Sequence, residues 1–444
     1  MRTTVLLAVL FLAGCASTGP DGGFHDVQQA VTSRTGAETR WLRSEKEVDS
    51  ARDRVAELLA QPLGADDAVQ IALLNNPGLQ ASYAELGVAG GDLLSSGVLP
   101  NPRLSYLRAS HGDAYKIETI LSFNILSLIA VPMALQAQQQ RFEGAKLQAA
   151  DEALRVAAET RKAYWRALAA QQLARYMEEV KSAAEASAEL AGRMVAAGNF
   201  SKLDRMREQA FYADAAAQLA RSRQQAVAER EKLVRLLGLW GEQIQFELPE
   251  RVPDLPAAAR ELPNAEQLAM EQRLDVRAAR REAEGLAKSL GLTRVTRFID
   301  EFELGIVRVT ETPEPRKKGY EIGVPIPLFD WGTGRVAGAE ARYLRAANRI
   351  AETAINGRSE VREAYHGYRT AYDVAKHYRD EVVPLRKQIS EEVLLRYNGM
   401  LMSVFELLTD AREQVSAVSA YIEALREYWL ADADLQRAMS GGAK

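Results

Sequence analysis

Two very long helical stretches constrain the fold of this chain more than any other feature. They cover residues 132–198 and 335–397, and each is followed by a further helix, at 201–237 and 403–439. The first stretch alone would extend roughly 100 Å at the rise of an α-helix. Since each pair is separated only by a short glycine-containing reversal, the sequence predicts two long helical hairpins.

Apolar residues in the last of these helices follow the rhythm of a coiled coil. They alternate in steps of four and three: Val404, Leu408, Ala411, Val415, Val418, Ile422, Leu425 and Trp429. The segment 176–197 has the same rhythm. An average period of about 3.5 residues predicts helices that wrap around one another. Additional alanines on neighbouring positions let a helix pack on two sides, as a wall of helices requires.

Short alternating segments precede both long stretches. Tyr115, Ile117, Thr119, Leu121, Phe123 and Ile125 fall on one side of a strand pattern, and Lys116, Glu118, Ser122 and Asn124 on the other. Similar alternation occurs at 302–306 and 320–328. The sequence therefore predicts two β-hairpins, at about 102–127 and about 299–329, with strands of the length found in outer-membrane proteins.

Four strands in one chain cannot close on themselves, and an open sheet edge is not tolerated in hydrocarbon. Three chains would supply twelve strands. We therefore expect a mainly α fold with long coiled-coil helices and a small β part, in which the four strands of each chain contribute to a β-barrel that several copies close together. Glu118, Glu303 and Glu321 would line a wet lumen, while aromatic and branched residues (Tyr115, Phe123, Ile322, Leu328) would face lipid. The alternative is a small soluble sheet packed on helices.

The two halves of the chain align with each other. Ala68, Ala72, Ala81 and Glu85 recur 197 residues later as Ala265, Ala269, Ala278 and Glu282. Arg161, Ala163, Tyr164 and Gly198 recur 201 residues later as Arg362, Ala364, Tyr365 and Gly399. An internal duplication explains both offsets. The first repeat would span 64–263, with its helical hairpin at about 132–237, and the second 264–444, with its hairpin at about 335–439. Each repeat would begin with a helix, one capped by Asp66 or Asp67 and running to about Ser95, the other from about Asn264 to Leu292. A charged helix over Gln28–Gln61 would precede them.

The N-terminus predicts export and lipidation. Residues 1–14 combine a basic start with an apolar run too short to span a bilayer, as in a secretory signal peptide. Cleavage before Cys15, the single cysteine of the chain, would leave it at the head of an N-terminal segment covering 15–63. Leu12-Ala13-Gly14-Cys15 is similar to a bacterial lipobox, so we expect Cys15 to carry the lipid anchor. An ordinary signal peptide that happens to contain a cysteine is the alternative.

The sequence contains no recognisable catalytic, cofactor or metal site. The net charge is −4 with both signs interspersed, which does not favour nucleic-acid binding. The four histidines are scattered, and no nucleophile elbow or phosphate loop occurs. Carboxylates near the helix reversals (Asp204, Glu391, Glu392, Asp410) could form rings around a three-fold axis, although such residues are more often a solvated face.

The two helix reversals are the best candidates for a functional surface. The segments 198–201 and 398–401 place Phe200, Met400 and Leu401 at turns. Exposed apolar side chains at a tip indicate a docking surface. Gly198 and Gly399 would permit the reversals, and a β-branched residue such as Gly399→Val should disrupt the second one. The alternative is that the apolar residues fold back onto the helix ends.

These features together resemble the TolC-type outer membrane efflux family, in its lipoprotein branch, over almost the whole chain. The residues that carry the resemblance are Leu12–Cys15, Asn76-Pro77, Pro325–Gly332, and Arg396–Gly399 followed by Ser403, Leu407, Leu408 and Ala411. It implies a homotrimer anchored in outer-membrane lipid, with a large periplasmic part. In such a trimer the long helices form a periplasmic α-barrel, four strands per chain contribute to a 12-stranded outer-membrane β-barrel, and the helix reversals face a periplasmic adaptor. It also implies two protein partners, a membrane-fusion adaptor and an inner-membrane pump of the RND type. The first half departs from the pattern, since Leu126–Pro132 replaces the Pro325–Gly332 motif.

The resemblance implies a passive exit duct of a tripartite efflux system, for drugs or heavy-metal ions. Two other functions stay open at this point: the outer-membrane component of a type I protein secretion system, and a soluble periplasmic coiled-coil adaptor. An adaptor would need one helical hairpin flanked by β-rich halves, whereas two hairpins are predicted here. An envelope enzyme is disfavoured because no site is recognisable.

Overall fold

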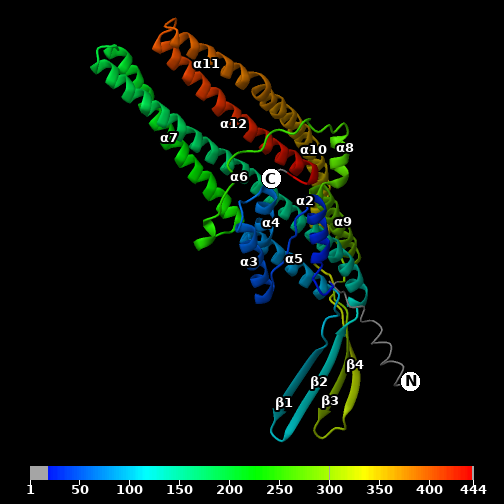
Figure 1. Ribbon diagram of the computed structural model, residues 1–444. Helices are drawn as coiled ribbons and strands as arrows, with labels where there is room; N and C mark the ends of the chain where they lie inside the picture. Colours follow the sequence, from blue (N-terminus) through cyan, green and yellow to red (C-terminus); the bar gives the residue numbers. More distant parts are fainter. Residues whose placement is uncertain (1–18, 300, 443–444) are drawn as a thin grey trace. The chain divides into compact units, whose positions relative to one another are not determined.

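The computed structural model describes residues 19–299 and 301–442, so the predicted signal peptide and Cys15 lie outside it. The chain forms two compact units (Figure 1). The first comprises the residues up to 27 together with 82–150 and 274–355, and the second comprises 28–81, 151–273 and 356 onward. Each unit therefore combines segments from both predicted repeats.

The order of elements in the first half recurs in the second. After α2 (Phe24–Thr35) and α3 (Glu45–Leu59), the chain forms α4 (Ala65–Asn75), α5 (Pro77–Ser96), β1 (Arg103–His111), β2 (Ala114–Asn124), α6 (Ser127–Ala196) and α7 (Lys202–Leu237). A connector containing the short 3-10 helix η1 (Gly241–Ile244) follows. Then come α8 (Ala265–Gln272), α9 (Leu274–Val295), β3 (Glu303–Glu311), β4 (Lys317–Gly323), α10 (Thr333–His377), the π-helical turn η2 (Tyr378–Val382), α11 (Val383–Asn398) and α12 (Val404–Ser440). None of the described helices is long and apolar enough to cross a membrane.

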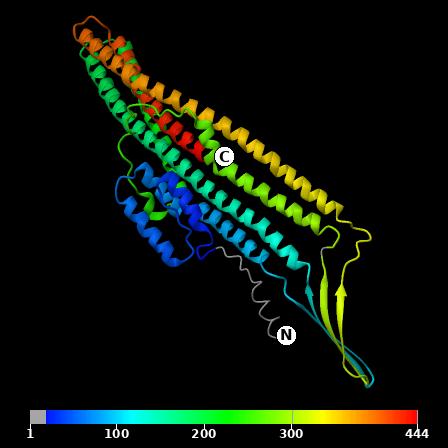
Figure 2. The same ribbon diagram turned by 90° about the vertical axis from the view of Figure 1, so that its right-hand side faces the viewer.

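The strands of the first unit form one antiparallel sheet in the order β1-β2-β3-β4. The two hairpins meet along β2 and β3, where Leu121 lies opposite Ile306. In the second unit, α7 runs back beside α6 and α12 runs back beside α11 (Figures 1 and 2). The predicted fold class, with long helices and a small four-stranded β part, is confirmed.

Two helices that the sequence predicts as continuous are interrupted in the structure. The predicted helix that runs to about Ser95 breaks at Asn76, with ψ 116°, and the one from Asn264 to Leu292 breaks at Arg273, with ψ 125°. Asn76 precedes Pro77, and a residue before proline is displaced from the helical region. The two breaks are 197 residues apart, the same offset as the aligned residues of the two halves.

Both breaks place a polar side chain on the end of a long helix. Nδ2 of Asn76 donates to the carbonyl of Leu236 at 2.8 Å, near the end of α7. Nη1 of Arg273 donates to the carbonyl of Ala438 at 2.9 Å, near the end of α12. Arg273 is only 1% exposed and also pairs with Glu360 at 2.7 Å. Because the last carbonyls of a helix have no partner within it, these side chains fix where α7 and α12 end.

Other boundaries also differ from the prediction. The predicted helix over Gln28–Gln61 is two helices, α2 and α3, since the chain turns at Gly36 with φ +71°. Residue Gly64, and neither of the aspartates that follow it, occupies the N-cap of α4. The first long helix begins at Ser127, five residues before Pro132. The second contains the π-helical turn η2, which ends two residues before Pro384, whose ring nitrogen cannot donate a backbone hydrogen bond.

The last strand is shorter than predicted. β4 ends at Gly323, whereas the alternating pattern continues to Leu328. Pro325 and Pro327 interrupt the ladder because they have no N–H to donate. Leu328, predicted to face lipid from a strand, therefore lies in an irregular segment, where it is 68% exposed.

Candidate functional site

The first helix reversal connects α6 to α7. Gly198 adopts φ +76°, a left-handed conformation that glycine reaches without steric cost. Ser201 caps α7, and its side chain accepts a hydrogen bond from the backbone N–H of Asp204 at 3.0 Å. The local sequence thus explains the turn: a glycine permits the reversal, and a serine begins the next helix.

The second reversal connects α11 to α12 and is built differently. Gly399 has φ −78° and ψ 4°, a conformation open to any residue, and the left-handed residue is Met400, with φ +60°. The expectation that Gly399 is required for this turn is therefore wrong. Ser403 and Glu406 form a capping box at the start of α12, and the backbone N–H of Ser403 holds the pKa of Glu406 below its usual range.

Apolar side chains are exposed at both reversals. Met400 is 94% and Leu401 79% exposed, as predicted, but Phe200 is half-buried and so contributes less than expected. Further exposed apolar residues close to the reversals were not predicted, among them Leu203, Met206 and Leu395. We refer to Leu203, Met206, Leu395, Met400 and Leu401 as the tip surface. Leu203, Met206 and Leu395 lie within eight positions of Gly198 or Gly399, so an inspection of the sequence around the two predicted reversals could have found them.

Two contacts between an arginine and a phenylalanine join the helices that leave the reversals. The guanidinium of Arg207 on α7 lies 4.6 Å from the ring centroid of Phe405 on α12. One turn further along α7, Phe211 receives the guanidinium of Arg412 from α12 at 5.2 Å. Such contacts are attractive because the face of an aromatic ring is negative. Sequence reasoning missed both, since the partners lie about 200 residues apart.

Two of the carboxylates near the reversals, Asp204 and Glu392, form ion pairs within the chain. Asp204 accepts from the hydroxyl of Ser201 and pairs with Arg207 at 3.3 Å. Glu392 pairs with Arg396 at 2.7 Å. Asp410 is buried, at 6% exposed, and its Oδ1 has no hydrogen-bond partner among the described residues. The structure therefore gives each of these three carboxylates a different environment.

The sheet register places an apolar band on one face and the three predicted carboxylates on the other. Each face is mixed, since Arg108, Arg308 and Lys318 share the face of the band and Leu107, Ile120 and Val307 share the face of the carboxylates. Paired residues of an antiparallel sheet share a face, and neighbours along a strand alternate. One face carries a continuous apolar band: Leu104, Leu121, Phe123, Leu304, Ile306, Tyr320 and Ile322, all exposed. The other face carries Glu118, Glu303 and Glu321. The structure thus brings the three predicted carboxylates to one face, opposite Tyr115, Phe123 and Ile322.

The polar face also contains basic residues. Glu303 pairs with Arg103 at 3.3 Å, and Glu118 pairs with Lys116 at 3.0 Å. Across residues 19–299 and 301–442, no three side chains of histidine, cysteine, aspartate or glutamate are grouped so that they could hold a metal ion. The site therefore consists of two surfaces, a two-faced sheet in one unit and an apolar tip surface in the other.

The chain is similar to several known proteins, to one in sequence and to others in fold. No family model matches the chain. The cobalt-zinc-cadmium resistance protein CzcC of Cupriavidus metallidurans is 23% identical over 382 residues, which cover 85% of this chain and 90% of the relative. Among solved structures, the outer membrane protein VceC of Vibrio cholerae superposes with a TM-score of 0.72 at 17% identity, covering 86% of this chain and 97% of VceC.

Two solved structures described as outer membrane channels are similarly close. OprN matches with a TM-score of 0.72 at 19% identity, over 93% of this chain and 95% of OprN. The open state of MtrE of Neisseria gonorrhoeae matches with a TM-score of 0.68 at 20% identity, over 85% of this chain and 89% of MtrE. The chain therefore shares a fold with these proteins over most of its length.

Proposed function

From its fold, which is that of the TolC-type outer membrane channels, we propose that this chain is the outer-membrane duct of a tripartite efflux system. The observation that carries the proposal is the sheet. β1 and β4 each pair on one side only within the described chain, and one face of the sheet is exposed and apolar. An open edge is unfavourable in lipid, so neighbouring copies must pair with both edges. Three copies would provide twelve strands.

The polar face of the sheet is then the lumen face. Single cysteines in place of Glu118 and Glu321 should react with a membrane-impermeant thiol reagent, and cysteines in place of Tyr115 and Ile322 should react little, because lipid covers them. The unsubstituted protein, whose single cysteine is Cys15, measures the background labelling in each experiment. The opposite pattern of labelling would mean that the apolar face lines the pore, and the proposed orientation would then be wrong.

Divalent heavy-metal ions are the cargo that we favour. The support is the relative CzcC, whose name describes resistance to cobalt, zinc and cadmium. The lumen face adds no support of its own for a cation, because Glu118 and Glu303 are paired with Lys116 and Arg103. A duct needs no closed set of metal ligands, since the ions must leave it again.

Deletion of the gene tests the function and the cargo together. The deletion strain should become several-fold more sensitive to cobalt, zinc and cadmium, and the intact gene should restore resistance. If the deletion strain became sensitive to drugs but not to these metals, the proposed efflux function would stand and the proposed metal cargo would be wrong. Unchanged sensitivity to metals and drugs, in a strain without a second such channel, would reject the efflux function.

We also propose that Cys15 carries a lipid anchor and that residues 1–14 are removed. The support is the Leu12–Cys15 motif and the lone cysteine. Cys15→Ser should abolish metabolic labelling with a radioactive fatty acid, whereas trimers should still form, because the sheet provides a second attachment to the membrane. Labelling that persists in the variant would place the lipid elsewhere.

The remaining proposals concern partners and origin. The pump would be an inner-membrane transporter of the RND type, joined to the duct by a periplasmic adaptor that contacts the tip surface. The two repeats, 64–263 and 264–444, would derive from a duplication. The support is the common offset of 197 residues between the aligned residues and between the breaks at Asn76 and Arg273.

A further inference from the structure

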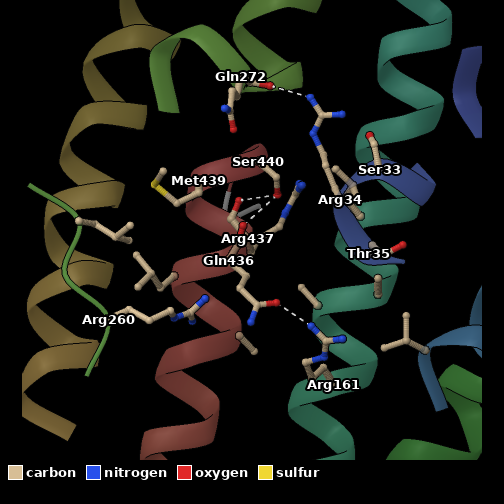
Figure 3. A pocket seen from close by; sticks show the side chains of 17 residues that line it. Ser33, Arg34, Thr35, Arg161, Arg260, Gln272, Gln436, Arg437, Met439 and Ser440 are labelled. Atoms are coloured by element: carbon tan, nitrogen blue, oxygen red, sulfur yellow. Dashed lines mark hydrogen bonds between the residues drawn. The ribbon is translucent and has the colours of Figure 1, made fainter. Parts of the chain in front are cut away.

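The second unit contains a cavity of about 420 Å³ that the proposed function does not use (Figure 3). Its walls come from the end of α2, from α6, from the connector before α8, and from the last turns of α12. All of these segments belong to one unit of one chain. A cavity of this size falls within the range of small-molecule sites.

The walls of the cavity carry four guanidinium groups and no carboxylate. The arginines are Arg34, Arg161, Arg260 and Arg437. Figure 3 shows that they reach the cavity from four separate segments. Ser33, Thr35, Gln272, Gln436 and Ser440 add hydroxyl and amide groups. Three of the arginines pair with carboxylates that are not lining residues: Arg161 with Asp66, Arg260 with Asp432, and Arg437 with Asp151.

Arg437 provides a second, independent indication. It is only 6% exposed, and its two terminal nitrogens bind the carboxylate of Asp151 at 2.7 and 3.1 Å. Its Nε–H is buried and has no acceptor within the part of the chain that the structure describes. A buried donor without an acceptor is costly, particularly on a charged group, and is rare in native proteins. An anion in the cavity would supply the acceptor.

We propose that this cavity binds an organic anion with a phosphate or carboxylate headgroup and a short apolar body. Guanidinium groups match the geometry of both headgroups and form strong charge-assisted hydrogen bonds with them. The apolar body would contact Val69, Leu154, Leu262, Leu435 and Met439, which line the rest of the cavity. The inference does not rest on the transport function, because every wall lies within a single chain.

Titration calorimetry on the purified full-length protein tests the proposal. Hexyl phosphate should bind with saturation, and inorganic phosphate should bind more weakly because it lacks the apolar body. Hexyltrimethylammonium, with the same body and the opposite charge, should not bind. Dihexanoyl phosphatidic acid, used below its micelle concentration, distinguishes the source: tighter binding than hexyl phosphate would indicate a lipid, and weaker binding a soluble anion.

Variants connect the binding to the arginines. Arg161→Gln and Arg260→Gln should each weaken hexyl phosphate binding about tenfold or more, as expected for the loss of one charge-assisted hydrogen bond. Arg175→Gln is the matched control, since Arg175 is an exposed residue on the same helix as Arg161 and does not line the cavity. Absence of binding, equal binding of the cationic probe, or unchanged affinity in both folded variants would overturn the proposal.

Discussion

Replacing Leu401 with aspartate should abolish efflux while the channel still assembles. Leu401 is 79% exposed at the second reversal, so the change costs the isolated protein little. In contact with an adaptor, the same side chain would be buried against an apolar surface. The aspartate loses that burial and brings an unpaired carboxylate into the interface, which together correspond to at least about 100-fold weaker binding.

The measurement is metal resistance in the deletion strain, combined with cross-linking of the channel to its adaptor. Leu401→Met should retain function because it keeps the size and polarity of the side chain. Val227→Asp is a control for an added charge elsewhere, since Val227 is 62% exposed on α7 and lies outside the tip surface. Full resistance of Leu401→Asp at normal trimer levels would exclude this reversal as the docking surface.

Gly332→Ala should strongly destabilise the connection between the sheet and α10. Gly332 has φ +70°, and a Cβ atom there would lie 2.3 Å from the carbonyl oxygen of Arg297. The left-handed conformation costs an alanine roughly 1–2 kcal/mol, and the contact with a backbone oxygen adds about 1–3 kcal/mol. Since whole domains are stable by only about 5–15 kcal/mol, we expect loss of the heat-stable trimer.

Gly334→Ala is the matched control for this experiment. Gly334 lies two residues later, in the first turn of α10, and a Cβ atom there would meet nothing within 4 Å. Alanine is the better helix former, so this variant should be as stable as the parent or slightly more stable. Semi-native gel electrophoresis over a temperature series measures both. Equal melting of the two variants would mean that the close approach to Arg297 does not limit stability.

The reversals show how far local sequence reasoning reaches. A glycine near the end of a long helical pattern, followed by serine, correctly located both turns at Gly198–Ser201 and Gly399–Ser403. It assigned the wrong residue to the left-handed position of the second turn, which is Met400. Local residue types predict that a helix ends, but the backbone path depends on how α11 and α12 must pack to return alongside each other.

The sequence by itself determined the long helices, the two helical hairpins and the two-faced strands. These features follow from residue periodicity, which is a local property: a repeat of about 3.5 residues forms a coiled-coil seam, and a repeat of two forms a strand with two faces. The end of β4 was predicted too late, at Leu328, because the alternation continues past Pro325 and Pro327, which cannot donate to a ladder.

The tertiary structure alone decided which distant residues meet. At the break that follows α8, Arg273 donates to the carbonyl of Ala438, and Arg207 contacts Phe405 on a helix from the other half. The four arginines of the cavity come from segments spread between residues 34 and 437. No local pattern encodes such meetings, because they arise when amphipathic helices pack together and buried polar groups must find partners across the unit.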